Sequence, residues 1–149
     1  MIEKVDHKRE EVAEQLYTIW QASYPVEKEM IGAEVFPPLD RSVHDFQSTE
    51  NVFYAYVINH EFAGVIEVAR IEEYIHLQSL VVHPAHFRKG IATALIKHVM
   101  ETHTNAKYSV ETGYENVPAK RLYESFEFRE TKAYDTDYGV KKIRFELKL

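Results

Sequence analysis

The sequence predicts a mixed α/β fold, and three observations support this prediction. Apolar residues make up 45% of the chain, with ten Tyr and eight Phe residues, which suits a packed core and excludes a disordered chain. Segments whose apolar side chains alternate with a period of two are interspersed with segments of helical period. A β-branched strand runs directly into a helix within residues 75–102. These patterns indicate about seven strands and about four helices, organised as a single domain over residues 1–149.

The N-terminal third carries a short strand, a helix and then an irregular segment. Residues 2–5 are predicted to form the strand, and residues 7–23 the helix, because apolar side chains recur there at helical spacing. Pro25 lies just beyond and is expected to end that helix. A second helix is expected near residues 41–47, within an irregular stretch of the kind that often shapes the entrance to a substrate site.

The rest of the chain alternates strands with two helices. Asn59-His60-Glu61 is typical of a hairpin turn. Pro118 falls in the first turn of the last helix, where its missing N–H costs little. We expect strands over 52–58, 62–70, 75–82, 107–113, 127–135 and 140–147, one helix over 88–103, and another that begins at Asn116.

The junction between strand and helix within residues 75–102 has the features of an anion site. The first N–H groups of a helix are free, and its dipole places positive charge at that end. Arg88 and Lys89 add positive charge, although solvated surface charges have the same appearance in a sequence. Gly90 lets the backbone approach a ligand. We expect a phosphate-bearing ligand here, and the two common nucleotide-binding loops, G-x-x-x-x-G-K-[ST] and G-x-G-x-x-G, are absent.

This junction resembles motif A of the GCN5-related N-acetyltransferase (GNAT) superfamily, L-x-V-x-P-x-x-[QR]-x-x-G-x-[GA]. Phe87 stands where the family usually has Gln or Arg. The order of the predicted elements also matches the family, so the resemblance implies a central mixed sheet of about seven strands flanked by about four helices. It also implies binding of acetyl-CoA, with the main chain of residues 80–82 pairing with the pantetheine arm as an added strand and the Val82 N–H supporting the thioester oxygen. The implied cofactor-binding residues are Leu80, Val81, Val82, Phe87, Arg88, Lys89, Gly90, Ile91, Ala92, Thr93 and Asn116.

A second segment, residues 116–128, resembles the family pattern N-x-x-A-x-x-L-Y-x-x-x-G-F. Glu127 replaces the glycine, which would cost about 1–2 kcal/mol if the position has a left-handed backbone. The resemblance implies that Asn116 contacts the pantetheine arm, and the same residue can also cap the helix. Tyr123 would donate a proton to the departing thiolate; alternatively it is a core aromatic residue with its hydroxyl at the edge.

The general base stays open between three residues. His76 is predicted to share a strand face with Leu80 and Val82, and it occupies the position where histone-type members of the superfamily have a basic glutamate. Glu111 lies five residues before Asn116, where ribosomal-protein alanine acetyltransferases have a catalytic glutamate. Glu67, within an apolar strand, is the third candidate, although strand carboxylates are more often solvated edge residues.

Composition excludes several classes of site and partner. The chain has no cysteine, so disulfides, thiolate metal sites and a cysteine nucleophile are excluded. A net charge of −6 argues against a nucleic-acid partner. No apolar run approaches the roughly 18 residues that a membrane span needs, and no secretory signal is visible, so we expect a cytoplasmic protein without a membrane partner. His83 and His86 form H-x-x-H, but no further ligands complete a metal site. The sequence leaves open whether the protein forms a homodimer.

These features predict an N-acyltransferase that moves an acetyl group from acetyl-CoA to an amine of a small molecule or peptide. Without a cysteine to hold the acyl group, direct transfer is the simplest route. The alternative is a non-catalytic acyl-CoA-binding or regulatory module on the same fold. A cationic amine is favoured if the acceptor side is lined by acidic residues, which are equally explained by solubility. The candidate acidic residues are Glu67, Glu72, Glu73, Glu111, Asp135 and Asp137.

Overall fold

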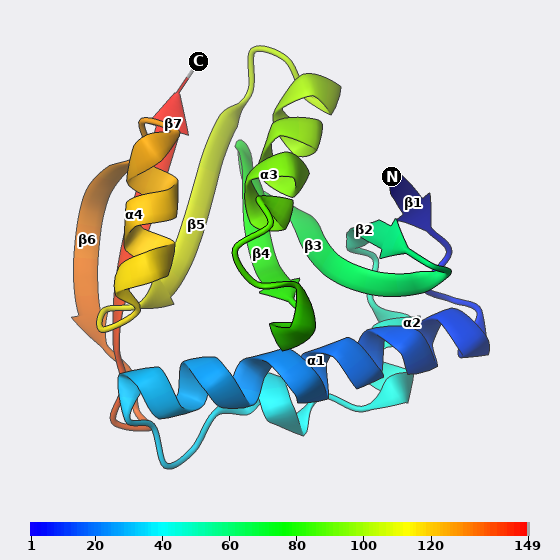
Figure 1. The fold of residues 1–149 in the computed structure, drawn as a ribbon. Helices are drawn as coiled ribbons and strands as arrows, with labels where there is room; N and C mark the ends of the chain where they lie inside the picture. The colour runs from blue at the N-terminus through cyan, green and yellow to red at the C-terminus, as the bar shows by residue number, and fades with distance from the viewer. Residues whose placement is uncertain (149) are drawn as a thin grey trace.

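The computed structural model describes residues 1–148 and consists of one seven-stranded mixed sheet with helices on both faces (Figure 1). The predicted mixed α/β fold, with seven strands and four helices, is confirmed. The strands follow the order β1-β2-β3-β4-β5-β7-β6 across the sheet. Their bounds are β1 Ile2–Val5, β2 Val52–Ile58, β3 Glu61–Ile71, β4 Tyr74–Val82, β5 Lys107–Gly113, β6 Arg129–Asp135 and β7 Lys141–Lys148. The helices are α1 Glu10–Ile31, α2 Val43–Ser48, α3 Ile91–Thr102 and α4 Val117–Ser125, with 3-10 turns at Pro37–Asp40 and Pro84–His86.

Two hydrophobic cores hold the helices on opposite faces of the sheet. On one face, α3 and α4 cover a cluster that includes Ile66 and Leu95, both fully buried. On the other face, α1 and α2 cover a cluster built around Trp20, Phe46 and Phe53. The Trp20 and Phe46 rings meet edge to face with their centroids 4.9 Å apart, a favourable aromatic geometry. The sheet is therefore the middle layer of three.

Strands β4 and β5 are parallel neighbours for only half of their length. Residues 74–77 of β4 pair with residues 107–110 of β5, and the described residues make no further pairs between these strands. Beyond that point the strands separate towards their C-terminal ends (Figure 1). Each keeps its other partner, because β4 continues along β3 and β5 continues along β7. The C-terminal half of each strand consequently presents an unpaired backbone edge to the space between them.

Helix α1 continues through Pro25, so the prediction that this proline ends the helix is wrong. A proline inside a helix removes one backbone hydrogen bond, but here the turns on both sides of it are held by packing. Tyr24 is buried, and the last turn lies so close to β5 that a Cβ on Gly113 would come within 2.9 Å of the Ile31 side chain. The helix ends instead at Gly32, whose left-handed backbone (φ 67°) is the usual conformation of such an end.

Helix α4 also ends in a left-handed residue, but that residue is Glu127 (φ 69°). Two hydrogen bonds close the helix, from the Phe128 N–H to the Tyr123 carbonyl (3.1 Å) and from the Glu127 N–H to the Glu124 carbonyl (2.9 Å). The Phe128 ring packs on the Tyr123 ring with centroids 6.0 Å apart, the apolar contact that commonly accompanies this type of helix end. The conformation that the family's glycine would adopt is therefore adopted here by glutamate, and it helps to hold Tyr123.

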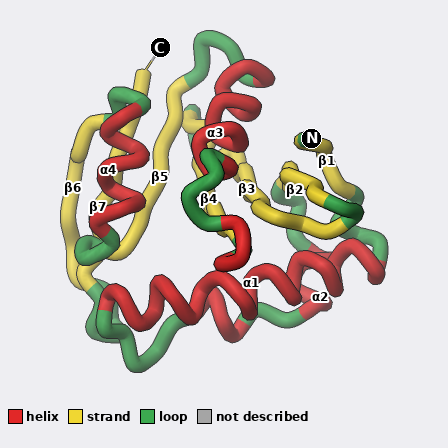
Figure 2. The backbone as a smooth tube through the Cα atoms, in the orientation of Figure 1, coloured by secondary structure: helices red, strands yellow, loops and turns green. Residues whose placement is uncertain are grey.

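The helix that follows β4 begins later in the chain than predicted. Figure 2 shows that β4 leads into a single 3-10 turn and a loop before α3 begins. We expected the helix to begin at residue 88, but it begins at Ile91, because Arg88 (φ 64°) and Gly90 (φ 74°) both have left-handed backbones that an α-helix cannot include. No helix within residues 1–148 is long and apolar enough to cross a membrane.

Candidate active site

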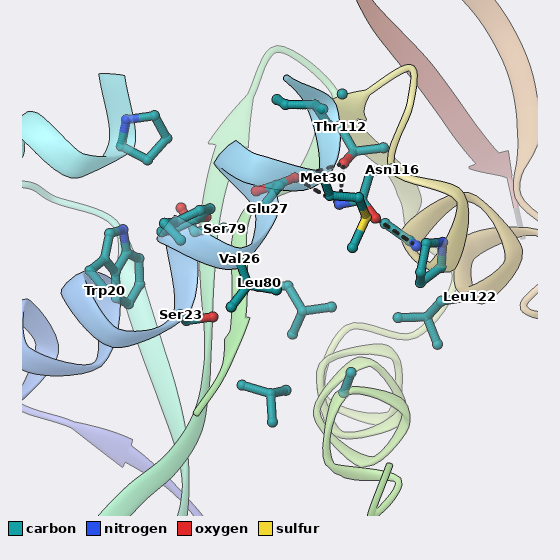
Figure 3. Close-up of a pocket in the computed structure, with 18 of the residues that line it drawn as sticks. Trp20, Ser23, Val26, Glu27, Met30, Ser79, Leu80, Thr112, Asn116 and Leu122 are labelled. Carbon is teal, nitrogen blue, oxygen red and sulfur yellow. Dashed lines mark hydrogen bonds between the residues drawn. The ribbon is translucent and has the colours of Figure 1, made fainter. Parts of the chain in front are cut away.

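A cavity of about 1050 Å³ fills the space between the separated halves of β4 and β5. Its walls come from β4, the beginning of α3, the end of β5 and the beginning of α4, and α1 crosses it (Figure 3). The α1 residues that line it include Trp20, Ser23, Glu27 and Met30, spaced by three or four residues so that they form one face of the helix. This face extends past Pro25, into the part of α1 that the sequence did not predict as helix.

One end of the cavity borders the first turn of α3. Gly90 is the N-cap of α3, and no side chain caps the free N–H groups of that turn. Arg88 lines the same region, and Phe87 lies beside it with its ring partly exposed. Uncapped helix N–H groups next to a guanidinium form a good site for a phosphate group. The structure therefore brings Arg88 and Gly90, two of the residues expected to bind an anion, to one place on the cavity wall.

Most of the predicted cofactor-binding residues line this cavity, and two do not. Those that line it are Leu80, Val82, Phe87, Arg88, Gly90, Ile91, Ala92, Thr93 and Asn116. Val81 points the other way and is buried in the core beneath α1, as strand alternation requires. Lys89 lies outside the cavity lining and is in hydrogen-bond range of His86 Nδ1, at 3.2 Å. The side chains of Val81 and Lys89 therefore lie outside the cavity lining.

A bulge in β4 moves His76 away from the predicted face. Val68 pairs with Leu77 and Glu67 pairs with Ser79, so Gln78 is an extra residue on β4. An extra residue reverses the alternation of side chains. His76 therefore lies on the opposite face from Leu80 and Val82, and the prediction that they share a face is wrong. This bulge could not be recognised from a strand pattern read with a strict period of two.

His76 is buried beside β5, outside the cavity lining. Its Nδ1 lies 2.7 Å from Ser109 Oγ, and 8% of the residue is exposed. Burial lowers the pKa of His76 below its ordinary value of 6.5, even though the negative charge of Glu111 opposes this effect. His76 is thus a neutral, hydrogen-bonded residue near the cavity, without a direct opening into it.

Glu111 does line the cavity, but two partners engage its carboxylate. The Tyr134 hydroxyl donates to one oxygen, and Arg144 Nη1 donates to the other at 3.1 Å. Burial raises the pKa of Glu111, but these hydrogen bonds outweigh that effect and hold it below its ordinary value of 4.5. A carboxylate that is stabilised in its charged form is a weak proton acceptor.

Glu67 is fully buried, and its carboxylate is saturated with donors. Arg41 donates to both oxygens, at 2.7 and 2.8 Å, and Asn51 and Ser79 each donate at 2.9 Å. The Arg41 guanidinium also lies over the Phe46 ring, 4.3 Å from its centroid. Glu67 does not line the cavity, and it is not a solvated edge residue either. Its role in this structure is to attach the loop before α2 to the sheet.

Residues 13–128 match the model of the acetyltransferase (GNAT) family. The chain belongs to this family. It is also 33% identical over 148 residues to the "UPF0157 protein YqkA" of Bacillus subtilis (strain 168), which covers 99% of this chain. The chain spans 43% of the length of that relative.

Solved GNAT structures share the fold over nearly the whole chain. The ribosomal-protein-S18-alanine N-acetyltransferase from Escherichia coli aligns with a TM-score of 0.75 at 22% identity, covering 99% of this chain and 92% of that one. The paia N-acetyltransferase from Thermoplasma acidophilum, in complex with coenzyme A, gives 0.75 at 17% identity, with 100% and 99% covered. An aminoglycoside 6'-N-acetyltransferase complexed with coenzyme A gives 0.73 at 15% identity, with 99% and 96% covered. At these identities the likeness shows the fold.

In this GNAT chain, Asn116 and Tyr123 lie on the α4 side of the cavity. Asn116 Oδ1 accepts from the Ala119 N–H at 3.2 Å, which confirms that Asn116 caps α4. Tyr123 lines the cavity but is only 5% exposed, with its ring against Phe128 and Phe145. Burial, together with the charge of Glu27, raises the pKa of Tyr123 above its ordinary value of 10.0. The phenol therefore stays protonated near neutral pH and is able to donate.

Sequence reasoning missed Glu27, a carboxylate inside the GNAT cavity. Glu27 Oε1 accepts from Asn116 Nδ2 at 2.8 Å and from Thr112 Oγ1 at 3.3 Å (Figure 3). Continuing the helical period through Pro25 would have found it, because Glu27 lies seven residues after Trp20 and three before Met30, on the same helix face.

The predicted acidic lining is corrected by the structure. Of the six acidic residues expected to line the acceptor side, Glu111 lines the main cavity and the other five do not. Glu67 is neutralised by Arg41, and Glu73 forms an ion pair with Lys107 on the outside. The charges that do border the cavity are mixed. The acidic residues are Glu27, Asp40, Asp45 and Glu111, and the basic residues are Arg41, Arg88 and Lys142.

Proposed function

We propose that this protein transfers an acetyl group from acetyl-CoA to an amine by direct attack of the amine on the thioester. The observation that carries the proposal is the separation of β4 and β5 beside the first turn of α3. That arrangement offers an anion site at one end of a cavity and an open strand edge along its wall. A long molecule with phosphate groups and an amide-containing arm, such as coenzyme A, matches both features.

The residues of the chain would then act in order along the cavity. The first-turn amides of α3 and Arg88 hold phosphate oxygens, and the open edge of residues 80–82 hydrogen-bonds the pantetheine arm. The Val82 N–H donates to the thioester oxygen as negative charge develops on it. Tyr123, kept protonated by burial, donates a proton to the departing sulfur. Because the chain has no cysteine, both substrates are bound together during transfer.

The test is the release of coenzyme A from acetyl-CoA in the presence of a panel of amines. A thiol-reactive dye reports coenzyme A alone, because the protein contributes no thiol. Initial-rate lines at several amine concentrations should intersect, and parallel lines with a recoverable acyl-protein would refute direct transfer. Saturable thermal stabilisation by acetyl-CoA without turnover of any amine would instead identify a non-catalytic binding module.

A further inference from the structure

We propose that Glu27 is a further catalytic residue, which takes a proton from the acceptor nitrogen, and that the acceptor enters as a protonated primary amine. This inference rests on the proposed function and names the acceptor class for it. It concerns a residue on α1, whereas the expected site residues lie on β3, β4, β5, α3, α4 and the loops between them.

The geometry leaves one oxygen of Glu27 available to a ligand. Oε1 is held by Asn116 and Thr112, at the start of α4 and the end of β5. Oε2 makes no hydrogen bond to any of the described residues. Every fully enclosed side-chain nitrogen or oxygen in residues 1–148 has a partner, so Oε2 is not fully enclosed, and Glu27 lines the cavity. A fixed carboxylate with one free oxygen is suited to receive an ammonium group.

The surroundings of Glu27 favour proton uptake. Burial raises the pKa of Glu27 above its ordinary value of 4.5, although the hydrogen bonds from Asn116 and Thr112 and the positive charge of Lys142 oppose the rise. Burial and the negative charge of Glu27 together raise the pKa of two phenols that line the same cavity, Tyr24 of α1 and Tyr123 of α4. Glu27 is thus near the proposed proton donor and is a stronger base than an exposed glutamate.

The other candidate bases are less suitable in this structure. His76 lies outside the cavity lining and is hydrogen-bonded to Ser109. Glu67 is saturated by Arg41, Asn51 and Ser79. Glu111 lines the cavity but is held in its charged form by hydrogen bonds. Of these four candidates, Glu27 is the one that combines a place on the cavity wall, a free oxygen and a raised pKa.

The proposed step conserves protons and electron pairs. The Glu27 carboxylate takes one proton from the ammonium group, and the freed nitrogen lone pair attacks the carbonyl carbon of the thioester. A C–N bond forms, the C–S bond breaks, and its electron pair leaves on sulfur. Tyr123 gives its proton to the thiolate and regains one from the new amide nitrogen. Glu27 then releases its proton to solvent, so that one proton appears for each amide formed.

The test compares a protonated and an uncharged acceptor in wild type and Glu27→Gln. The protonated probe is the fastest of spermidine, kanamycin and an alanine-initiated tetrapeptide, and the uncharged probe is hydroxylamine, which is largely neutral at neutral pH and needs no base. With the protonated amine, kcat/KM should fall by about 100-fold or more in Glu27→Gln, and the acidic limb of its pH profile should disappear. With hydroxylamine, which also cleaves thioesters unaided, the rate in excess of a protein-free control should be unchanged. Glu29→Gln, on the exposed side of the same helix, is the matched control and should behave as wild type.

Each alternative outcome is distinct. Equal losses with both acceptors would show that Glu27 only supports the structure around Asn116, and no loss with either would exclude any role; both results overturn the inference and leave the proposed function intact. Absence of turnover with all probes in wild type would overturn the proposed function and this inference together. Stability gives a readout that needs no acceptor: because burial raises the pKa of Glu27, ionising it opposes folding. Glu27→Gln should therefore unfold at a higher temperature than wild type at about pH 7, with the difference vanishing below about pH 4.

Discussion

Replacing Glu127 by glycine should stabilise the protein, because α4 ends on this residue in a left-handed conformation. The backbone φ of Glu127 is 69°, a region that costs a residue with a Cβ about 1–2 kcal/mol relative to helical φ. The side chain is exposed and makes no hydrogen bond or ion pair with the described residues, so removing it sacrifices no contact of that kind. The two main-chain bonds that close the helix do not involve the side chain and should persist.

The expected gain is the released strain minus the entropy that glycine adds to the unfolded chain. The extra conformational entropy of glycine in the unfolded chain costs about 0.5–1 kcal/mol. Glu127→Gly should therefore raise the free energy of unfolding by about 0.5–1 kcal/mol. For a protein of this size that corresponds to a Tm increase of about 1–4 °C. Tyr123 should keep its position, because its contact with Phe128 is untouched.

Urea unfolding and thermal scans of three variants would check this reasoning. Glu127→Ala keeps the Cβ and should leave stability unchanged. Glu124→Gly, three residues earlier and inside the helix, should lose about 1 kcal/mol, because glycine is a poor helix former. Opposite signs for the two glycine variants are therefore the signature of backbone strain at residue 127. If Glu127→Gly were no more stable than Glu127→Ala, the strain argument would be refuted.

Three further predictions concern the proposed site and the buried ion pair between Arg41 and Glu67. Gly90→Asp places negative charge at the first turn of α3 and should weaken acetyl-CoA binding several-fold or more in calorimetry, whereas Gly32→Asp, with a similar left-handed backbone at the end of α1, should not. Tyr123→Phe should lower kcat more than it raises the KM for acetyl-CoA; a change in KM alone would mean that the hydroxyl only positions the substrate. Arg41→Ala leaves the buried Glu67 carboxylate without its bidentate partner and should cost about 3–5 kcal/mol of unfolding free energy, and adding Glu67→Gln should recover part of that loss.

Most of the fold could be predicted because hydrophobic periodicity reports which side chains face the core. The strands are found close to their predicted bounds, and the alternation is clearest in β7, where every second residue is buried. Pro25 misled the prediction because the cost of a proline within a helix is local, whereas the compensation comes from tertiary packing of Tyr24 and Ile31. Such compensation leaves no local signal.

The candidate site also contains features that local sequence predicts and features that depend on tertiary contacts. The turn proposed to bind an anion could be located because a strand, a glycine and a helix are contiguous in the sequence. The position of His76, one of the predicted bases, could not be predicted, because the bulge at Gln78 reverses the alternation of β4 and moves His76 to the other face. The contacts of Glu67 with Arg41 and of Glu27 with Asn116 join residues far apart in the chain. A single sequence does not reveal such pairs.

The separation of β4 and β5 also bears on solubility. A free strand edge on the outside of a protein tends to recruit strands from other molecules and to cause aggregation. Here the free edges lie inside the sheet, flanked by α3 and α4, where a slender extended ligand can enter more readily than a second protein's strand. The true outer edges are β1 and β6, and β6 carries Arg129, Glu130, Lys132 and Asp135, charges that discourage pairing. The fold can thus keep main-chain hydrogen-bonding groups vacant for a substrate without presenting them to other protein molecules.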